Sequence, residues 1–361
     1  MLSERITRNW IQAFRDTFEL CRIKAGDPVA ILSESLSRQC NVLMAELALA
    51  EIGAIPFHIH MPSLPAGSIP IRSTGASQVL RGLSPVVKAL GASTMVADLT
   101  VEGILHAPDL PAILQAGARC LYISNDHPEI LERCKPDRAL RDKVIVGSEL
   151  LRNAKHMRVK SAAGTDLSIE IAGSRAGGNW GVCEEPGSLA HWPGGLIACF
   201  PGRNSVNGTL VLDAGDINLT FKKYIDSAVT FRIENDYVKS IEGKGYDAEM
   251  MRAYYAAWNE SNAYAVSHVG WGMNPGARWD SFTMYDKGDT NGTEQRAYAG
   301  NFLYSTGANL FAQRETICHF DLPVRNCTIT VDDVTVVQDG QLNNSLFEQS
   351  PSPSMVGGRR F

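Results

Sequence analysis

Hydrophobic and polar positions alternate along the chain in two different ways, and the change falls near residue 155. Before it, helical stripes of apolar residues spaced three and four apart are interrupted by short, continuous apolar runs. Because strands that alternate with helices form parallel or mostly parallel sheets, residues 1–150 are predicted to be an α/β domain. The expected elements are helix 4–23, strand 29–32, helix 38–52, strand 54–59, helix 85–90, strand 94–98, helix 110–116, strand 119–123 and helix 129–134.

After this point polar and apolar residues alternate with a period of two, which is typical of half-exposed antiparallel strands. Residues 151–342 are therefore predicted to be a second, α+β domain. Its expected elements are strands 157–161, 166–171, 208–212, 228–233, 237–241, 327–331 and 334–337, helices 248–260 and 294–303, and an irregular Gly- and Pro-rich loop over 173–195. The polar residues 343–361 are expected to be a tail, disordered or wrapped on a neighbouring subunit.

Composition and charge narrow the class of protein. A net charge of −5, without a run of Lys or Arg, argues against a nucleic-acid partner. The sequence shows neither an apolar stretch of membrane-spanning length nor the apolar core of a signal peptide, so a cytoplasmic protein without a membrane partner is expected. The eight cysteines have no C-x-x-C spacing and several lie in apolar surroundings, which predicts reduced, mostly buried thiols.

A candidate metal site centres on the predicted strand at residues 317–323, which contains His319 and Asp321. Side chains two apart on a strand project from the same face, so this imidazole and carboxylate point toward one place and supply two ligands. The alternative is structural: Asp321 caps a turn and His319 bonds to a backbone carbonyl. The apolar neighbours favour the metal site, because a carboxylate buried among them needs a cation or hydrogen bonds to compensate its charge.

The third ligand is predicted to be His268, which leads into the Gly-rich stretch 270–276. Glycines at such spacing allow a backbone to bend sharply, often close to a ligand. The alternative is a core histidine before a structural turn. Two imidazoles and one carboxylate are the composition of the triad that holds Fe(II), and zinc would also accept these ligands.

Four more polar residues are candidates for the chemistry around the metal. His106 and His191 each stand two residues before a proline, and a neutral imidazole can move a proton in either direction. The alternative is that both are loop histidines without a role in the chemistry. Arg296 and Ser305 flank a stretch between the two metal-ligand segments and are candidates for orienting a polar ring; surface capping is the alternative. Dinucleotide, P-loop and nucleophile-elbow signatures are missing from the sequence.

The segments 268–277 and 319–322 resemble two metal-binding segments of the thermophilic-type metallo-aminopeptidases, and the likeness covers most of the chain. Two departures separate the chain from those peptidases. They typically have Glu where this chain has His268, and Glu after a Pro-x-Gly turn where this chain has Leu196. Without these carboxylates the site suits one Fe(II) rather than two metals. The chain is similar along its full length to the 2,5-dihydroxypyridine 5,6-dioxygenases of bacterial nicotinate breakdown, a branch with that pattern.

The resemblance implies an aminopeptidase-T-like fold, a mononuclear Fe(II) site and ring opening of 2,5-dihydroxypyridine by O2 to N-formylmaleamate. It also implies a homo-oligomer. By the same resemblance, the iron ligands are His268, His319 and Asp321, the acid–base pair is His106 and His191, and the substrate contacts are Leu105, Arg296 and Ser305.

Two other functions stay open at this point. A metallo-aminopeptidase using zinc or cobalt would share the fold, but His268 stands where it would need Glu. A member of the fold that binds no metal is the other alternative, and ligand chemistry at all three positions argues against it.

Overall fold

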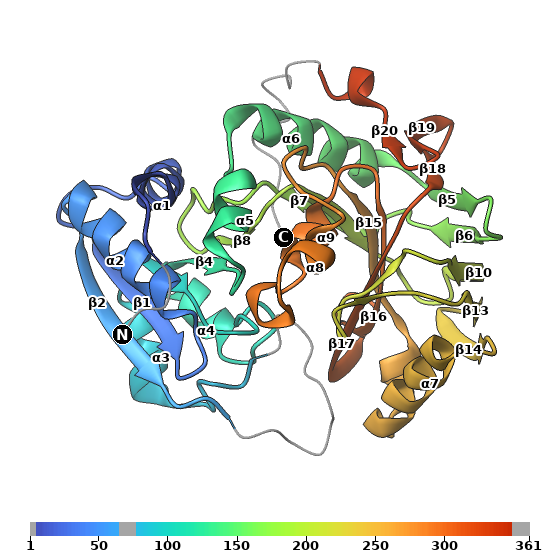
Figure 1. Ribbon diagram of the computed structural model, residues 1–361, viewed down its shortest axis with the longest axis horizontal. Helices are drawn as coiled ribbons and strands as arrows, with labels where there is room; N and C mark the ends of the chain where they lie inside the picture. The colour runs from blue at the N-terminus through green and yellow to red at the C-terminus, as the bar shows by residue number, and fades with distance from the viewer. Residues whose placement is uncertain (1–4, 65–76, 349–361) are drawn as a thin grey trace.

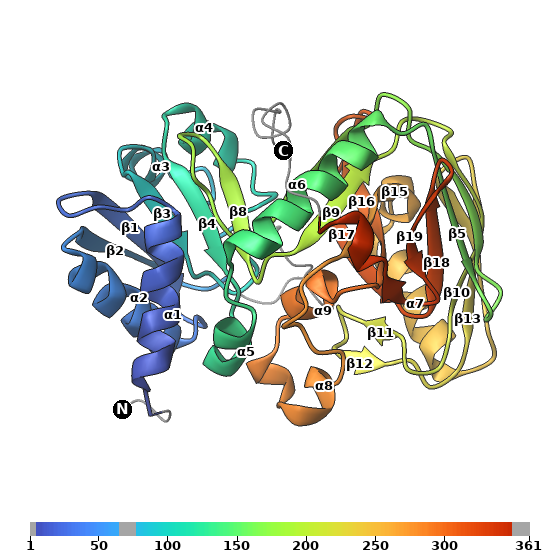
Figure 2. The ribbon, with the colours of Figure 1, turned by 90° about the horizontal axis from the view of Figure 1, so that it is seen from above.

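The computed structural model describes residues 5–64 and 77–348, in which three large sheets follow one another across the molecule (Figure 1, Figure 2). We call them the parallel sheet, the central sheet and the outer sheet. The parallel sheet has the strand order β2-β1-β3-β4-β8, the central sheet β17-β16-β15-β9-β7, and the outer sheet β14-β13-β10-β6-β5-β18-β19-β20.

The parallel sheet confirms the α/β pattern expected at the N-terminal end, because every strand pair in it is parallel. Its two faces are both buried: Val29 and Ile31 pack with α1 and α2, whereas Ala30 and Leu32 pack on the side of α3 and α4. Gly53 ends α2 in the left-handed conformation that favours glycine (φ +81°). The elements are α1 Arg8–Leu20, β1 Pro28–Glu34, α2 Gln39–Ile52, β2 Ile55–Met61, α3 Ser84–Gly91, β3 Met95–Asp98, α4 Leu110–Gln115, β4 Arg119–Ile123, α5 Pro128–Arg133, α6 Arg138–Asn153 and β8 Leu189–Trp192.

The central and outer sheets are antiparallel throughout, as the two-residue alternation predicts. In the central sheet lie β7 Arg175–Asn179, β9 Leu196–Phe200, β15 Val266–Gly272, β16 Phe302–Asn309 and β17 Arg314–Val324. In the outer sheet lie β5 His156–Ser161, β6 Asp166–Glu170, β10 Val206–Leu212, β13 Val229–Glu234, β14 Tyr237–Glu242, β18 Cys327–Val331, β19 Val334–Gln338 and β20 Gln341–Leu342. The remaining elements are β11 Ile217–Asn218, β12 Lys223–Tyr224, α7 Tyr246–Trp258, α8 Ser281–Met284, α9 Thr293–Ala297 and the 3₁₀ helices η1 Ser261–Tyr264, η2 Lys287–Asp289 and η3 Asn344–Leu346.

Two expected elements are wrong. The stretch 173–195 is not an irregular loop, because it contains β7 and β8, which join two different sheets. Its glycines serve close packing: a Cβ added to Gly178 would lie 2.4 Å from Val144 of α6. The helix expected over 294–303 is the short α9, after which the chain continues as β16.

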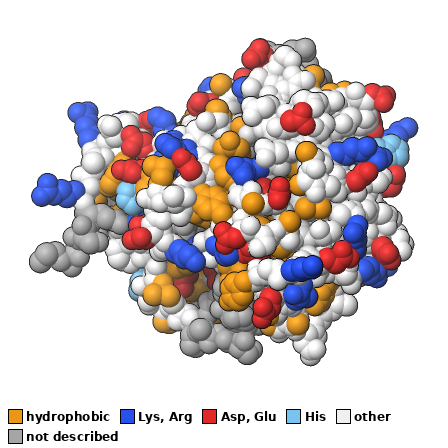
Figure 3. Space-filling model, turned by 45° about the vertical axis from the view of Figure 1, so that its right-hand side comes forward, with side chains coloured by type: hydrophobic (Ala, Val, Ile, Leu, Met, Phe, Trp, Pro, Cys, Tyr) orange, Lys and Arg blue, Asp and Glu red, His pale blue; other side chains and the backbone are white. Residues whose placement is uncertain are grey.

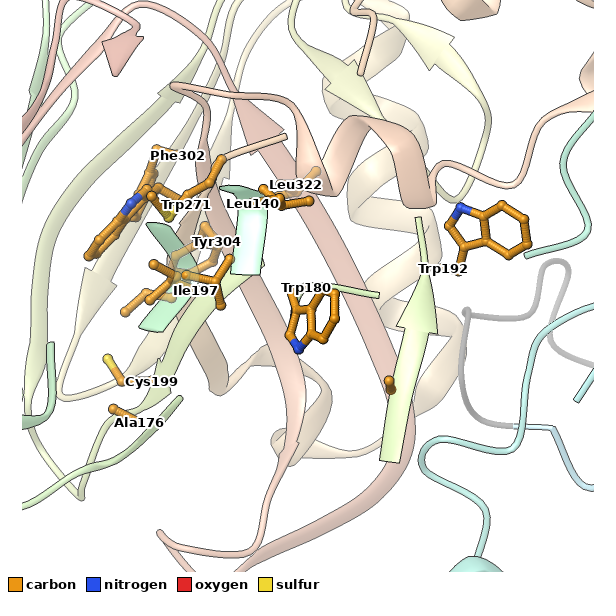
Figure 4. Close-up of a cluster of buried hydrophobic side chains, with 14 of the residues drawn as sticks. Leu140, Ala176, Trp180, Trp192, Ile197, Cys199, Trp271, Phe302, Tyr304 and Leu322 are labelled. Atoms are coloured by element: carbon orange, nitrogen blue, oxygen red, sulfur yellow. The ribbon is translucent and has the colours of Figure 1, made fainter. Parts of the chain in front are cut away.

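The largest cluster of buried apolar side chains runs without interruption from the parallel sheet to the outer sheet. Phe14 of α1 packs edge-on against Trp192 of β8, with ring centroids 5.0 Å apart. Figure 4 shows part of this cluster, including Trp192 and Trp271. Since β8 completes the parallel sheet from beyond residue 150, the packing crosses the expected domain boundary, and the division at that residue stays a prediction.

At the C-terminal end, residues 343–348 pack on the rest of the chain. Phe347 is buried, and Asn344 in η3 accepts a hydrogen bond from Lys143 Nζ at 3.0 Å. The remainder of the expected tail, 349–361, lies outside the described residues.

Three general expectations can be compared with the described part of the chain. All eight cysteines are buried and free of disulfide bonds, which confirms the predicted thiols. Among the described residues, no helix is both long and apolar enough to cross a membrane. On the face in Figure 3, acidic and basic side chains are interspersed rather than gathered by sign.

Candidate metal centre

The three predicted ligands converge on one point of the central sheet. His319 and Asp321 project from the same face of β17, and His268 reaches them from β15. Asp321 Oδ1 lies 3.2 Å from His319 Nε2 and 3.6 Å from His268 Nε2. One ligand atom from each of the three residues falls within 4.8 Å of the others, and all three residues are buried. This donor set fits a single metal ion with open coordination positions.

The pairing of three adjacent strands brings these ligands together. β16 lies between β15 and β17 and pairs antiparallel with both, so that Ser305 stands opposite Asp321 and Gly307 opposite His319. Gly307 has a φ of +120°, and a Cβ there would come within 2.0 Å of the Cys318 carbonyl oxygen. A side chain at this position would push away the strand that carries two of the ligands.

Two neighbours hold the Asp321 carboxylate in place. Arg296 Nε donates to Oδ2 at 2.5 Å, and Ser305 Oγ donates to Oδ1. Burial opposes a charge on Asp321, but the imidazole of His319 and the guanidinium of Arg296 outweigh it and hold the pKa of this carboxyl well below its usual value. Asp321 is therefore an ionised carboxylate whose orientation is set from two sides.

His268 is held as a neutral imidazole. Burial lowers its pKa to about 3, although the charge of Asp321 acts in the opposite direction. The ring of Phe200, at the end of β9, meets it edge-on with centroids 5.4 Å apart. Its Nδ1 has no hydrogen-bond partner among the described residues, while Nε2 faces Asp321. A neutral imidazole with its Nε2 turned toward a carboxylate is the form that binds a metal.

His106 comes to the cluster from the parallel sheet, on the loop that follows β3. Its ring lies over that of His319, with centroids 4.7 Å apart and planes tilted by 39°. Although the residue as a whole is exposed, the dense protein around the ring and the nearby His319 lower the pKa of His106 to about 3. A neutral imidazole thus stands directly beside a predicted metal ligand.

His191 is placed by β8, the strand that the sequence pattern assigned to a loop. Burial lowers its pKa to about 4, and the charges of Arg296 and Asp321 also act on it. Its Nδ1 lies 2.7 Å from the carbonyl oxygen of Pro193. Because a carbonyl only accepts, Nδ1 carries the proton, which leaves Nε2 able to accept one.

Proteins of known function share the sequence of this chain over most of its length. Residues 9–344 match the family model of 2,5-dihydroxypyridine 5,6-dioxygenase. Over 336 residues the chain is 34% identical to the 2,5-dihydroxypyridine 5,6-dioxygenase of Pseudomonas putida KT2440, covering 92% of this chain and 95% of that protein. The chain belongs to the 2,5-dihydroxypyridine 5,6-dioxygenase family. The predicted family is therefore confirmed.

Solved structures agree with that assignment. The fold matches the structure of 2,5-dihydroxypyridine dioxygenase from Pseudomonas putida KT2440 with a TM-score of 0.88 and 32% identity, over 95% of this chain and 100% of that one. AmpT from Thermus thermophilus matches with a TM-score of 0.56 and 12% identity, over 93% and 99%. The second likeness concerns the fold alone, and it confirms the expected aminopeptidase-T-like architecture of this dioxygenase family member.

Sequence reasoning did not single out all residues that surround the cluster. Phe200 and Asn291 carried no motif, and only the folded chain brings them near His268 and Arg296. Leu105 is half-buried beside His106, and its role stays a prediction.

Proposed function

We propose that this chain opens the ring of 2,5-dihydroxypyridine with O2, giving N-formylmaleamate, and that it uses Fe(II) bound by His268, His319 and Asp321. The observation that carries the proposal is the convergence of these three buried donors within 4.8 Å, in a chain of the 2,5-dihydroxypyridine 5,6-dioxygenase family. Two imidazoles and one carboxylate are the donor set that suits Fe(II) and leaves positions open for other ligands.

The charge states of the ligands favour this use. His268 is neutral and Asp321 ionised at neutral pH, so neither has to lose a proton before binding a cation. Fe(II) bound there would supply the one-electron chemistry that lets O2 react with an electron-rich ring. Arg296 and Ser305 hold the two oxygens of Asp321 and thereby fix the direction of the carboxylate.

His191 and His106 are proposed to move protons during ring opening. The Nε2 of His191 is free to accept a proton from a substrate hydroxyl, because Nδ1 is engaged with Pro193. His106, which is neutral and whose ring lies beside that of His319, is proposed to hold or return a proton on the other side of the substrate. We propose that Leu105, Arg296 and Ser305 also border the ring of the substrate, as the family resemblance implies.

We further propose a cytoplasmic homo-oligomer, organised as residues 1–150, 151–342 and 343–361. The continuous core between the first two parts predicts that they do not unfold independently. Calorimetry with a single unfolding transition would support this, and size-exclusion chromatography with light scattering would measure the number of subunits.

The activity can be tested by reconstituting the purified protein with Fe(II) without oxygen, then adding air and 2,5-dihydroxypyridine. We expect one O2 consumed per ring opened, loss of the substrate's ultraviolet absorbance, and no reaction with zinc in place of iron. Absence of O2 uptake in the iron-loaded protein would refute the proposal. Release of an amino acid from an aminoacyl amide by the zinc or cobalt form would favour a peptidase instead.

A further inference from the structure

The segment 287–296, which contains η2 and most of α9, lies between the central sheet and the parallel sheet (Figure 2). Asp126, just after β4, accepts a hydrogen bond from the backbone N–H of Asn291 at 2.5 Å. The neighbouring His127 donates its backbone N–H to the carbonyl of Asp289 at 2.7 Å. The segment is therefore attached to the carboxyl end of a strand in the parallel sheet, which is where ligand sites of such sheets lie.

The side chain of Asn291 reaches further, to the base of the loop that carries His106. Its Nδ2 donates to the carbonyl oxygen of Val101 at 3.0 Å and to Tyr122 Oη at 2.5 Å. Tyr122 Oη in turn donates to the same Val101 carbonyl at 3.0 Å. The three groups form a closed triangle of hydrogen bonds between the segment 287–296, β4 and this loop.

The loop between Val101 and His106 has other attachments besides this triangle: the N–H of Val101 donates to Glu34 Oε1 at 2.8 Å, and the N–H of Ser77 donates to the Gly103 carbonyl oxygen at 3.0 Å. The buried carboxylate of Asp98 accepts the backbone N–H of Ile104 at 2.7 Å. Gly103, with a φ of +77°, lies so close to Tyr122 that an added Cβ would come within 2.8 Å of the aromatic ring. Tyr122 therefore supports the loop by contact, and its hydroxyl is the group that Asn291 fixes.

Asn291 also contacts Arg296, which holds the carboxylate of Asp321. Its carbonyl oxygen accepts from Arg296 Nη1 at 3.5 Å, and Arg296 Nε holds Asp321 at 2.5 Å. One residue thus contacts both the loop of His106 and the group that orients a predicted metal ligand.

We propose that Asn291 is a positioning residue that sets the separation between His106 and the metal ligands. This inference rests on the proposed function, because the separation matters only if His106 acts on a molecule bound at the metal. A proton passes between groups about 3 Å apart, and a displacement of about 1 Å can lower the rate roughly a hundred-fold. Among the attachments of this loop, the triangle also reaches Arg296 through Asn291, and it thereby relates the position of the loop to that of the metal ligands.

The test compares Asn291→Ala with Asp289→Asn, a matched control in the same segment. Asp289 pairs with Arg38 and is not part of the triangle. In the iron-loaded protein we expect Asn291→Ala to lower kcat about ten- to a hundred-fold, with KM for 2,5-dihydroxypyridine changed less than about three-fold. Fe(II) affinity should equal that of the wild type, and Asp289→Asn should keep wild-type kcat.

Two results would overturn the proposal. Wild-type kcat in Asn291→Ala would show that the triangle positions nothing the reaction uses. A loss of Fe(II) affinity as large as the loss of kcat would show that Asn291 acts through Arg296 and Asp321, not through His106.

Amide hydrogen exchange tests the positioning role of Asn291 independently of the enzyme's activity. Asn291→Ala should speed amide exchange in peptides that cover residues 99–107, whereas Asp289→Asn should not. Unchanged exchange in both variants would refute the positioning role even if the enzyme works. A wild-type protein that leaves 2,5-dihydroxypyridine intact would refute the proposed function, whatever the exchange rates are.

Discussion

The central sheet and the parallel sheet hold their parts of the candidate metal centre in different ways. His268, His319 and Asp321 lie on strands of one antiparallel sheet, and the pairing of β15, β16 and β17 fixes their relative positions. His106 lies on a loop after β3, which is held by hydrogen bonds to side chains and backbone groups of several segments and not by strand pairing.

The predicted metal ligands are therefore expected to be held more rigidly than His106. A ligand set fixed by backbone pairing is rigid, because a shift of any strand would break many hydrogen bonds at once. A group on a loop, whose backbone is not paired as a strand, can adjust as a substrate enters and leaves. Substitutions in the two regions are therefore expected to have different effects: replacing a metal ligand should reduce metal binding, whereas replacing His106 should reduce turnover.

The largest effect is expected from removing a ligand. His319→Ala should lose iron binding and turnover together, because two donors remain where three are needed. His106→Ala, in the loop, should keep its iron and lose turnover by about 10²- to 10⁴-fold, the usual contribution of one acid–base group. Elemental analysis after Fe(II) loading and O2 uptake measure both. Iron retained in His319→Ala would remove this residue from the site.

The next effect tests the rigidity of the central sheet. Gly307→Ala should lower the free energy of unfolding by about 3 kcal/mol, because the new methyl group meets the Cys318 carbonyl and φ is +120°. Gly288→Ala is the control, since an added Cβ there meets nothing within 4 Å. Chemical denaturation of both variants gives the comparison; equal stabilities would mean that β16 and β17 adjust more easily than their pairing implies.

A smaller effect is expected when the orientation of a ligand is loosened. Ser305→Ala removes one of the two donors to Asp321 and should weaken Fe(II) binding about 10- to 100-fold. Thr306→Val, on the same strand, removes a hydroxyl that bonds to Tyr255 and should leave Fe(II) affinity unchanged. Titration with Fe(II) under nitrogen measures both, and equal affinities in the two variants would contradict a role for Ser305 at the metal.

The smallest effect is expected from Asp98, which accepts a hydrogen bond from Ile104 in the loop that carries His106. Burial raises the pKa of Asp98 to about 6, so the folded protein binds a proton that the unfolded chain has already released between roughly pH 4 and 6. Stability from this group is therefore lost as the pH rises through that window, by about 1 kcal/mol between pH 5 and 7. Asp98→Asn should remove this difference. Denaturant unfolding of both proteins at the two pH values measures it; identical pH dependence would show that Asp98 titrates normally.

Much of the site could be predicted because the relevant pattern is local. His319 and Asp321 are two apart on a strand, and a period of two places them on one face whatever the rest of the chain does. The glycines after His268 indicate a sharp bend, but Gly270 and Gly272 lie inside β15. Gly270 allows close strand pairing instead, since a Cβ there would lie 1.9 Å from the Ile197 carbonyl oxygen.

The other parts depend on pairing between distant segments, which local patterns do not reveal. Nothing around Leu189–Trp192 shows that this strand joins β4 of the parallel sheet, so His191 was expected on a loop. The role of Asn291 depends on partners contributed by the loop after β3 and by β4. Glycines in β7 indicated a loop because their use, close packing against α6, is visible only in the folded chain.

The late position of β8 in the sequence has a consequence for synthesis on the ribosome. The first four strands of the parallel sheet emerge well before Leu189–Trp192, and until then β4 has an open edge with unpaired backbone groups. A nascent chain in this state is open to pairing with other chains, and a chaperone that covers β4 would protect it. The folding of the N-terminal half is thus completed only when the chain has started on the central sheet, to which β7 belongs.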